Sequence, residues 1–152
     1  MSQKPTAENR QAYFNYFISD KFEAGLVLSG SEVKSIREGR VNLKDAYVRI
    51  FNGEAHVVGM HISPYSHIER SDSFDPTKSR KLLLHKQEIE KLTGLISKKG
   101  FTCIPLSIYF KRGIAKLEIG IGKGKKEHDK RDSIKTKMHQ REMKQALKHR
   151  SK

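Results

Sequence analysis

Residues 120–131, GIGKGKKEHDKR, mark the point at which an alternating strand pattern stops and a strongly basic tail begins. Before this stretch, apolar residues recur at strand or helix spacing. After it, the apolar residues form no continuous face. The sequence therefore predicts a flexible N-terminus of residues 1–11, a packed body of residues 12–122 and a basic C-terminal tail of residues 123–152.

The charge of the tail indicates a polyanionic partner. Residues 123–152 carry twelve Lys or Arg against four Asp or Glu, a net +8 out of the +14 of the whole chain. The rest of the chain adds +6, from 19 basic and 13 acidic residues. Because Lys and Arg that neutralise phosphates release condensed counterions, a nucleic acid is the expected partner.

The composition indicates a soluble, cytoplasmic protein without membrane contact. The first eleven residues, MSQKPTAENRQ, contain no apolar segment typical of a signal peptide. The longest largely apolar stretch, residues 101–110, is too short to span a bilayer. Cys103 is the single cysteine and has no partner for an internal disulfide, so we expect it to be a buried apolar residue.

The body is predicted to be mainly β, with about six short antiparallel strands and two or three inserted helices. Asn52-Gly53 is the strongest hairpin signal, because both central residues of a type I′ turn need positive φ. Pro105 predicts a bulge or an edge position in its strand. The strands are expected at residues 12–18, from 26, 46–51, 54–62, 101–111 and 114–121, and the helices at 30–40 and 86–99.

These elements suit a small closed barrel with helices at its ends better than a sandwich. An oligonucleotide-binding barrel is the specific prediction, although periodicity alone does not separate it from other small barrels. Residues 20–25 are expected to form a turn, Ser31 to cap the first helix, and residues 63–79 to form a long surface loop. The aromatic residues of 12–18 are expected to be buried; the alternative is that they present rings to a ligand.

The motifs for enzymatic chemistry are incomplete. The glycine-rich stretch lacks P-loop spacing, because Ile119 stands where a glycine is required and Lys126 where Ser or Thr is required. Its alternating glycines and lysines instead suit a flexible backbone laid against phosphates, or a solvated exit from the last strand. The seven histidines are scattered and the acidic residues form no paired-carboxylate motif. We therefore expect a non-enzyme without metal or cofactor.

Three positions of the body have two interpretations each. Glu23 is either a solvated turn residue or an acceptor for a base amino group or a 2′-OH. Lys116 lies on the wet face of its strand and could reach phosphate. The leucine run at 82–84 either exposes one leucine or packs wholly under the following helix.

The tail is rich in helix formers but has no single apolar stripe. On a helix, Ile134 and Met138 fall on roughly the opposite side from Met143 and Leu147. A predominantly like-charged helix is marginal alone in water. We expect the tail to be disordered when free and helical when a polyanion neutralises its lysines.

Four long motifs follow one another along the chain: NRQAYFNY (9–16), FEAGLVLSGSEVKSIREGRVNLKDAYV (22–48), DPTKSRKLLLHKQEI (75–89) and GKGKKEHDKR (122–131). In this order and spacing they resemble the small protein B family, the SsrA-binding proteins that partner transfer-messenger RNA in bacterial ribosome rescue. The likeness runs from about Asn9 to Arg131, and the tail beyond is matched in length and character.

This resemblance implies a barrel that grips the tRNA-like end of transfer-messenger RNA (SsrA RNA) and delivers it to stalled ribosomes for trans-translation and peptide tagging. The body stands in for the missing anticodon arm, and the tail enters the empty messenger channel as a helix, near small-subunit rRNA. Alanyl-tRNA synthetase supplies the alanine and elongation factor Tu takes part in delivery. The chain is expected to act as a monomer without bond chemistry of its own.

The resemblance also implies the site residues. RNA-binding positions fall on Asn9, Glu23, Leu83, His85, Lys116, Lys123, Lys125 and Lys126. The decoding-centre contacts fall on His128, Asp129, Lys130 and Arg131, and the tail-helix positions on Met138, Met143 and Lys144. The chain departs from the family at Gln11, usually basic, at Lys78, commonly arginine, and at Ala46, commonly serine. These departures weaken the expected N-terminal phosphate contact.

Two other classes of function remain as alternatives. A general ribosome-associated or single-strand-RNA chaperone on the same barrel predicts sequence-indifferent binding through exposed aromatic rings, with a steep dependence on salt. A nuclease predicts RNA cleavage that depends on a divalent metal, for which the sequence offers no ligand set.

Overall fold

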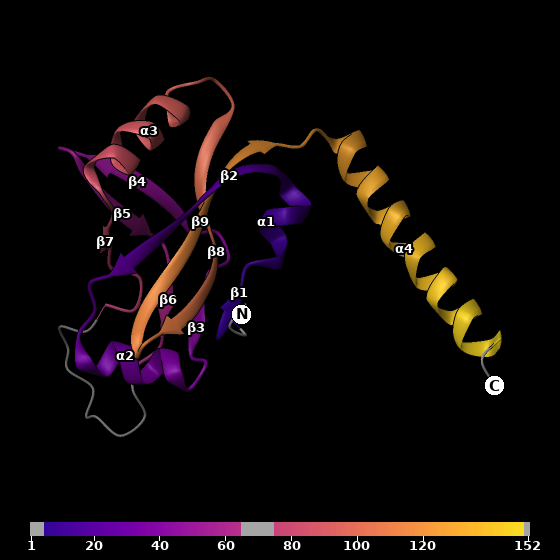
Figure 1. The fold of residues 1–152 in the computed structure, drawn as a ribbon, viewed down its shortest axis with the longest axis horizontal. Coiled ribbons are helices and arrows are strands. Elements are labelled where there is room, and N and C mark those ends of the chain that lie inside the picture. The colour runs from indigo at the N-terminus through magenta and orange to yellow at the C-terminus, as the bar shows by residue number, and fades with distance from the viewer. Residues whose placement is uncertain (1–4, 65–74, 151–152) are drawn as a thin grey trace.

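The computed structural model of the chain describes residues 5–64 and 75–150. Residues 1–4, 65–74 and 151–152, which include much of the expected loop at 63–79, lie outside the described residues. Six antiparallel strands close into a ring in the order β8-β4-β5-β7-β2-β9, with β9 pairing back onto β8 (Figure 1). They are β2 (Tyr16–Leu26), β4 (Tyr47–Phe51), β5 (Glu54–Val58), β7 (Arg80–Leu83), β8 (Phe101–Lys111) and β9 (Ile114–Gly124). The predicted closed barrel is confirmed.

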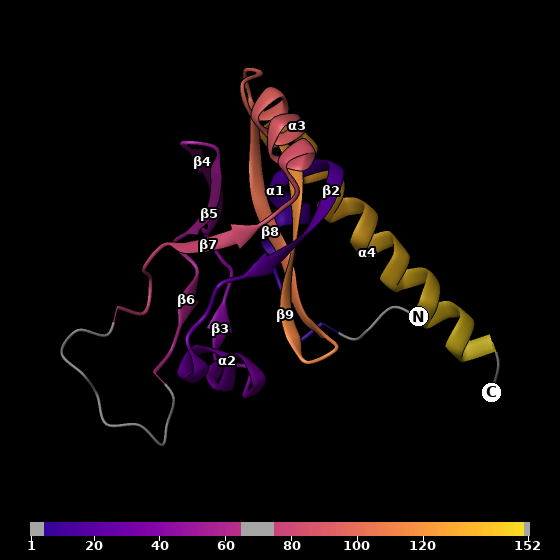
Figure 2. The ribbon, with the colours of Figure 1, turned by 60° about the vertical axis from the view of Figure 1, so that its left-hand side comes forward.

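Helices and short strands complete the body. Helices α3 (Lys86–Ile96) and α2 (Gly30–Arg37) lie at opposite ends of the barrel, as Figure 2 also shows. The short strand β1 (Ala7–Glu8) pairs with β8, and β3 (Val41–Asn42) pairs with β6 (His61–Ile62). The remaining helices are α1 (Arg10–Asn15), before the first barrel strand, and α4 (Glu127–Arg150), after the last.

Both tight hairpins turn at two residues with positive φ, as predicted for Asn52-Gly53. Asn52 and Gly53 have φ values of 50° and 73° between β4 and β5, and Arg112 and Gly113 have 52° and 78° between β8 and β9. The predicted irregularity at Pro105 is confirmed, because the β8–β9 register shifts between Pro105 and Ser107. The N-terminal segment pairs with β8 beside this irregularity, where the Asn9 N–H donates to the Leu106 carbonyl at 2.8 Å.

The core fills the barrel as the alternation in β9 predicts. Ala115, Leu117, Ile119 and Ile121 are all 5% exposed or less. Cys103 on β8 is fully buried, and burial raises the pKa of its thiol to about 12, so it is an unreactive apolar side chain. Ile36 of α2 and Leu92 of α3 are also fully buried, and each anchors its helix to an end of the barrel.

The N-terminal third differs from the sequence prediction. Residues 12–15 belong to helix α1 and not to a strand, and residues 20–25 continue strand β2 instead of turning. Pairing with β9 explains the second difference, because it supplies β2 with partners from Lys21↔Gly120 to Gly25↔Lys116 that local composition does not reveal. Residues 7–11, expected in the flexible N-terminus, form β1 and the first turn of α1.

Helix α2 starts where predicted, at Gly30, but its N-cap lies two residues earlier than predicted. Ser29, not Ser31, is the N-cap: its side chain accepts from the Glu32 backbone N–H at 3.3 Å, while the Glu32 carboxylate accepts from the Ser29 N–H at 3.0 Å. This reciprocal pair is a capping box. The helix ends before Gly39, whose φ of 76° is the left-handed conformation that glycine commonly adopts just after a helix C-terminus.

The alternating glycines of 120–124 are part of β9 and not of a flexible loop, and the strand extends three residues beyond the predicted end at 121. A Cβ on Gly120 would lie 2.8 Å from Leu106, and one on Gly122 would lie 2.9 Å from Tyr16. These glycines let a second small core, built around Ala12, Ile104 and Leu106, pack against the outer surface of the barrel. Helix α1 therefore covers part of β8, and Tyr16, the first residue of β2, covers Gly122 of β9.

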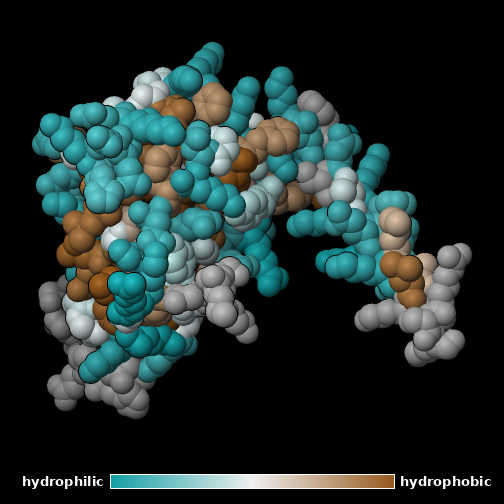
Figure 3. Space-filling model, viewed as in Figure 1, coloured by the Kyte–Doolittle hydropathy of each residue, from teal (hydrophilic) through white to brown (hydrophobic). Residues whose placement is uncertain are grey.

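From Glu127 to Arg150 the tail forms a single helix, α4, that projects away from the barrel (Figure 1). Figure 3 shows it as a mostly hydrophilic arm. Ile134, Met138, Met143 and Leu147 are between 45% and 64% exposed, which agrees with the prediction that the tail has no stripe to dock on the body. Within the described residues, no helix is long and apolar enough to cross a membrane.

Candidate nucleic-acid interface

Three of the predicted RNA-binding residues lie together on the outer surface of the barrel. Strand pairing places Leu83 of β7 beside Gly25 of β2, Gly25 beside Lys116 of β9, and Lys116 beside Tyr109 of β8. Glu23 lies two residues before Gly25 on the same face of β2. We call Glu23, Leu83, Tyr109 and Lys116 the β-face site.

Leu83 is exposed because of its position in the pleat. Its neighbour Leu82 is 1% exposed and fills the barrel, so Leu83 points outward and is 56% exposed. The Cβ of Leu83 lies 3.3 Å from the position that a Cβ on Gly25 would take. The leucine run therefore does expose one leucine, and Gly25 leaves the space into which it packs.

Hydrogen bonding and charge fix the carboxylate of Glu23. The Tyr109 hydroxyl donates a hydrogen bond to Glu23, and Lys111 Nζ lies 3.5 Å from Glu23 Oε1. The hydrogen bond from Tyr109 is the main cause that holds the pKa of Glu23 below its usual value, and the charges of Lys111 and Lys116 add to it against a smaller effect of burial. Glu23 is thus an ionised acceptor with a fixed orientation, suited to a base amino group or a 2′-OH.

His85 extends the β-face site along the chain. It follows β7 by two residues and is the N-cap of α3, where its backbone N–H donates to Glu88 Oε1 at 3.0 Å. Because the capping interaction fixes the start of α3, the position of the imidazole relative to Leu83 is set by the end of the strand and the first turn of the helix.

Lysines lie beside aromatic rings from other segments where β9 leaves the barrel. Lys123 pairs in register with Phe17 of β2 and with Phe101 of β8, and its Nζ lies 5.9 Å from the centre of the Phe101 ring. Lys125 Nζ lies 5.0 Å from the Phe17 ring centre and donates to the Tyr13 carbonyl at 3.1 Å. We call Tyr13, Phe17, Lys123 and Lys125 the exit platform.

The aromatic members of this platform were missed by the sequence prediction, which favoured burial. Tyr13 is 48% exposed and Phe17 is 53% exposed. The signal that could have found them is their proximity in the fold to the lysines after β9, which the printed sequence separates by more than a hundred residues. Exposed rings beside lysines are the combination with which proteins stack bases and neutralise phosphates.

The predicted decoding-centre residues begin helix α4. The Lys126 backbone N–H donates to Asp129 Oδ2 at 3.2 Å, so Asp129 caps the first turn, and Lys130 and Arg131 follow it. The side chain of His128 lies outside the described part of the chain. Met138, Met143 and Lys144 are exposed farther along the arm.

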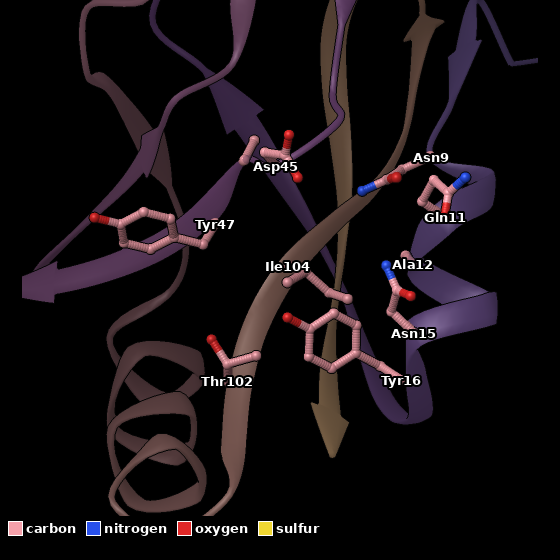
Figure 4. Close-up of a pocket in the computed structure, with 10 residues that line it drawn as sticks. Asn9, Gln11, Ala12, Asn15, Tyr16, Asp45, Tyr47, Thr102 and Ile104 are labelled. Atoms are coloured by element: carbon pink, nitrogen blue, oxygen red, sulfur yellow. The ribbon is translucent and has the colours of Figure 1, made fainter. Parts of the chain in front are cut away.

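Asn9 is apart from both surfaces and is 8% exposed. Its amide nitrogen donates to the Pro105 carbonyl at 2.9 Å and to the Leu43 carbonyl at 3.4 Å. It therefore ties the N-terminal segment to the β8 bulge. It also lines a pocket between α1, β8 and the start of β4, drawn in Figure 4.

Among the side chains that the structure describes, no group of three or more His, Cys, Asp or Glu is placed to hold a metal ion.

The fold and these surfaces define a class of protein, a small closed β-barrel with a lysine-rich aromatic surface and a separate basic helix. The family model described as SmpB protein matches residues 6–149. The chain belongs to the SmpB family, and the resemblance found in its motifs is confirmed.

Relatives in two bacteria match over nearly their whole length. An SsrA-binding protein of Clostridium beijerinckii is 54% identical over 153 residues, with 99% of this chain and 96% of the relative covered. One of Geobacter sulfurreducens is 49% identical, with 100% and 99% covered. A chain in the solved structure "tmRNA-SmpB: a journey to the center of the bacterial ribosome" is 40% identical, with a TM-score of 0.68 over 84% of this chain and 93% of that chain.

Proposed function

We propose that this protein binds the tRNA-like domain of transfer-messenger RNA and brings it to stalled ribosomes for trans-translation. The observation that carries the proposal is the joining of residues distant in sequence into the β-face site, on a chain that belongs to the SmpB family. A fixed carboxylate, a lysine and an exposed leucine on one rigid sheet can read RNA shape and 2′-hydroxyls together.

The body and the arm have separate tasks in this proposal. The β-face site, His85 and the exit platform bind RNA, with Lys126 at the junction. The arm, which carries much of the positive charge, enters the empty messenger channel, and residues 128–131 act at the decoding centre. The arm is disordered before it binds, because a like-charged helix without a docking stripe is marginal in water.

The partners follow from this task. Small-subunit rRNA neutralises the arm, and elongation factor Tu joins through the RNA complex. The protein works as a monomer, in the cytoplasm where ribosomes act, and it performs no bond chemistry itself. His128→Ala should therefore spare RNA binding and impair tagging, and a loss of RNA affinity would contradict this division.

The deciding experiment compares the full chain with a version that ends at Arg131. Each is titrated onto transfer-messenger RNA and onto an unrelated structured RNA at physiological salt, and each is assayed for peptide tagging in a stalled translation extract. We expect both proteins to bind transfer-messenger RNA with similar affinity and to prefer it, and only the full chain to support tagging. Equal affinity of the full chain for both RNAs would instead identify a general RNA chaperone that uses Tyr13 and Phe17.

A further inference from the structure

The pocket beside Asn9 is a second feature of the barrel surface that the proposed function does not use. It has a volume of about 340 Å³ and lies between helix α1 on one side and the start of β4 on the other, with β8 behind it (Figure 4). Ile104 and Ala12 provide an apolar floor, and Gln11, Asn15, Asp45 and Thr102 provide polar walls. In Figure 4, the Tyr16 ring lies across its lower part, near Ile104 and Thr102.

The walls of the pocket offer unused polar groups. Within residues 5–64 and 75–150, no hydrogen bond or ion pair involves the Asp45 carboxylate or the side-chain amides of Gln11 and Asn15. Asn9, by contrast, has its amide hydrogens directed to two backbone carbonyls. The pocket therefore presents one anionic acceptor and two amides to a ligand.

The backbone holds Asp45 in place. Asp45 has φ 64°, a left-handed conformation that Asp and Asn tolerate better than other non-glycine residues. The turn is closed by a hydrogen bond of 3.1 Å from the Ala46 N–H to the Leu43 carbonyl. Gly59 lies against it, since a Cβ there would be 3.5 Å from the Asp45 carbonyl oxygen.

Tyr16 is held in the same way by its neighbour. Its Cβ and ring atoms lie 2.9 to 3.1 Å from the position of a Cβ on Gly122, so the side chain rests directly on the β9 backbone. The ring is thus a rigid aromatic wall beside an apolar floor. Neither Lys nor Arg lines the pocket, which makes it unsuited to a phosphate.

An apolar floor, an aromatic wall, amides and a carboxylate are the groups that recognise an unstacked base. Carboxylates accept hydrogen bonds from exocyclic amino groups, and amides bond to base edges in pairs. We propose that the pocket between α1 and the start of β4 binds one unpaired nucleobase carrying an exocyclic amino group, with Asp45 as its acceptor. This inference rests on the proposed function, because the base belongs to the RNA that the protein binds.

The substitution Asp45→Asn tests the proposal, because the proposal and the change in net charge predict opposite changes in RNA affinity. It keeps the shape and the tolerance for positive φ, removes the anionic acceptor and raises the net charge by one. Electrostatics alone would strengthen binding to RNA. The proposal requires the opposite, a loss of about tenfold in affinity for the tRNA-like domain, with the slope of log K against log salt unchanged.

The matched control is Asp75→Asn, the same chemical change at an exposed aspartate outside the pocket. Asp75 Oδ1 accepts from the Thr77 N–H at 3.0 Å, which an asparagine oxygen can also do. We expect this variant to bind as tightly as the parent protein or slightly more tightly. Circular dichroism and thermal melting of both variants establish that each is folded at the temperature of the titration.

Chemical probing identifies the base. Reagents that modify the pairing edges of unpaired A, C and G should find one base protected by the parent protein and exposed again in the Asp45→Asn complex, while other protections persist. Replacing that base with uracil should weaken RNA binding by the parent protein by about the same factor. It should not weaken RNA binding by the Asp45→Asn variant any further. Unchanged or stronger binding of Asp45→Asn, or identical protections in both complexes, overturns the proposal.

This outcome is separate from failure of the proposed function. If the full chain does not prefer transfer-messenger RNA to an unrelated RNA, the proposed function fails whatever Asp45→Asn does. If the preference stands and Asp45→Asn binds normally, only the base pocket is wrong.

Discussion

The hydroxyl of Tyr109 on β8 donates a hydrogen bond to the carboxylate of Glu23 on β2, across the intervening strand β9. The two residues are 86 positions apart in the sequence. Because Tyr109 and Lys116 pair in register, the phenol and the ammonium group flank Glu23 on the same sheet. The carboxylate of Glu23 is therefore oriented by Tyr109, which is not among the predicted RNA-binding residues.

We expect Tyr109→Phe to raise the pKa of Glu23 toward its usual value, since the lost hydrogen bond is the main cause of its lowering. Glu23 stays ionised at neutral pH, so affinity for the tRNA-like domain falls only several-fold, through loss of orientation. As pH falls, binding that needs the carboxylate is lost at a higher pH in the variant. Carboxyl NMR titration measures the pKa, with Glu54 as an internal control because its pKa is lowered chiefly by Lys81. An unchanged Glu23 pKa would contradict this account.

Lys116→Met should weaken RNA binding and reduce the salt slope by about one ion, because a phosphate contact is lost. Lys98→Met, in the exposed segment just after α3, is the control and should leave both quantities almost unchanged. Titrations at several salt concentrations give the slope. The phosphate role of Lys116 fails if affinity falls while the slope stays as in the parent protein.

Phe17→Ala should weaken binding to RNA with unpaired bases by about fivefold to a hundredfold, the range for loss of one stacked base. Phe51→Ala is the matched control, because Phe51 is 58% exposed on the β4–β5 hairpin and Phe17 is 53% exposed on the exit platform. Equal losses for both phenylalanines would show that the effect is not specific to the platform.

Arg80→Met should cost about 3–5 kcal/mol of the free energy of unfolding, because it removes the buried partner of the Glu32 carboxylate and leaves only the half-exposed Lys78, whose Nζ lies 3.7 Å from Glu32 Oε1. Arg80 Nε lies 2.5 Å from Glu32 Oε2, and both side chains are 3% exposed or less. Lys81→Met removes the exposed pair with Glu54 and should cost about 1 kcal/mol or less. Urea unfolding measures the free energy of unfolding of both variants. Similar losses in the two variants would contradict the expectation that the buried ion pair contributes more than the exposed one.

The same pair predicts how stability depends on pH. Burial raises the pKa of Glu32, but hydrogen bonds from Ser29 and Arg80 outweigh it and hold the pKa below its usual value. A lowered folded-state pKa means that this contribution is present above about pH 4.3, the usual pKa of Glu, and is lost as pH falls through the folded-state value. Glu32→Gln should therefore be less stable at neutral pH and lose less stability on acidification. If the free energy of unfolding falls equally on acidification in the two proteins, Glu32 does not contribute to the pH dependence of stability.

Local patterns in the sequence predicted the parts of the fold that local physics controls. Asn52-Gly53 and Arg112-Gly113 turn where positive φ is needed, and the alternation in β9 fills the barrel. The same patterns failed for residues 12–15 and 20–25. There the chain follows long-range pairing of β2 with β9 and packing of α1 on β8, which no local window contains.

The sequence by itself determined the mainly β class, the two tight hairpins with the four strands β4, β5, β8 and β9 beside them, the basic arm without a docking face, and membership of a family through four long motifs. Only the tertiary structure decided which outward residues meet. Closure of β2, β9 and β8 brings Glu23 to Tyr109 and Lys116, and pairing of β2 with β9 places Phe17 beside Lys123. Packing of α1 on β8 creates the pocket with Asp45. The physical reason is that turns and alternation depend on neighbours in the chain, whereas a surface site depends on strand register and helix packing between segments far apart in it.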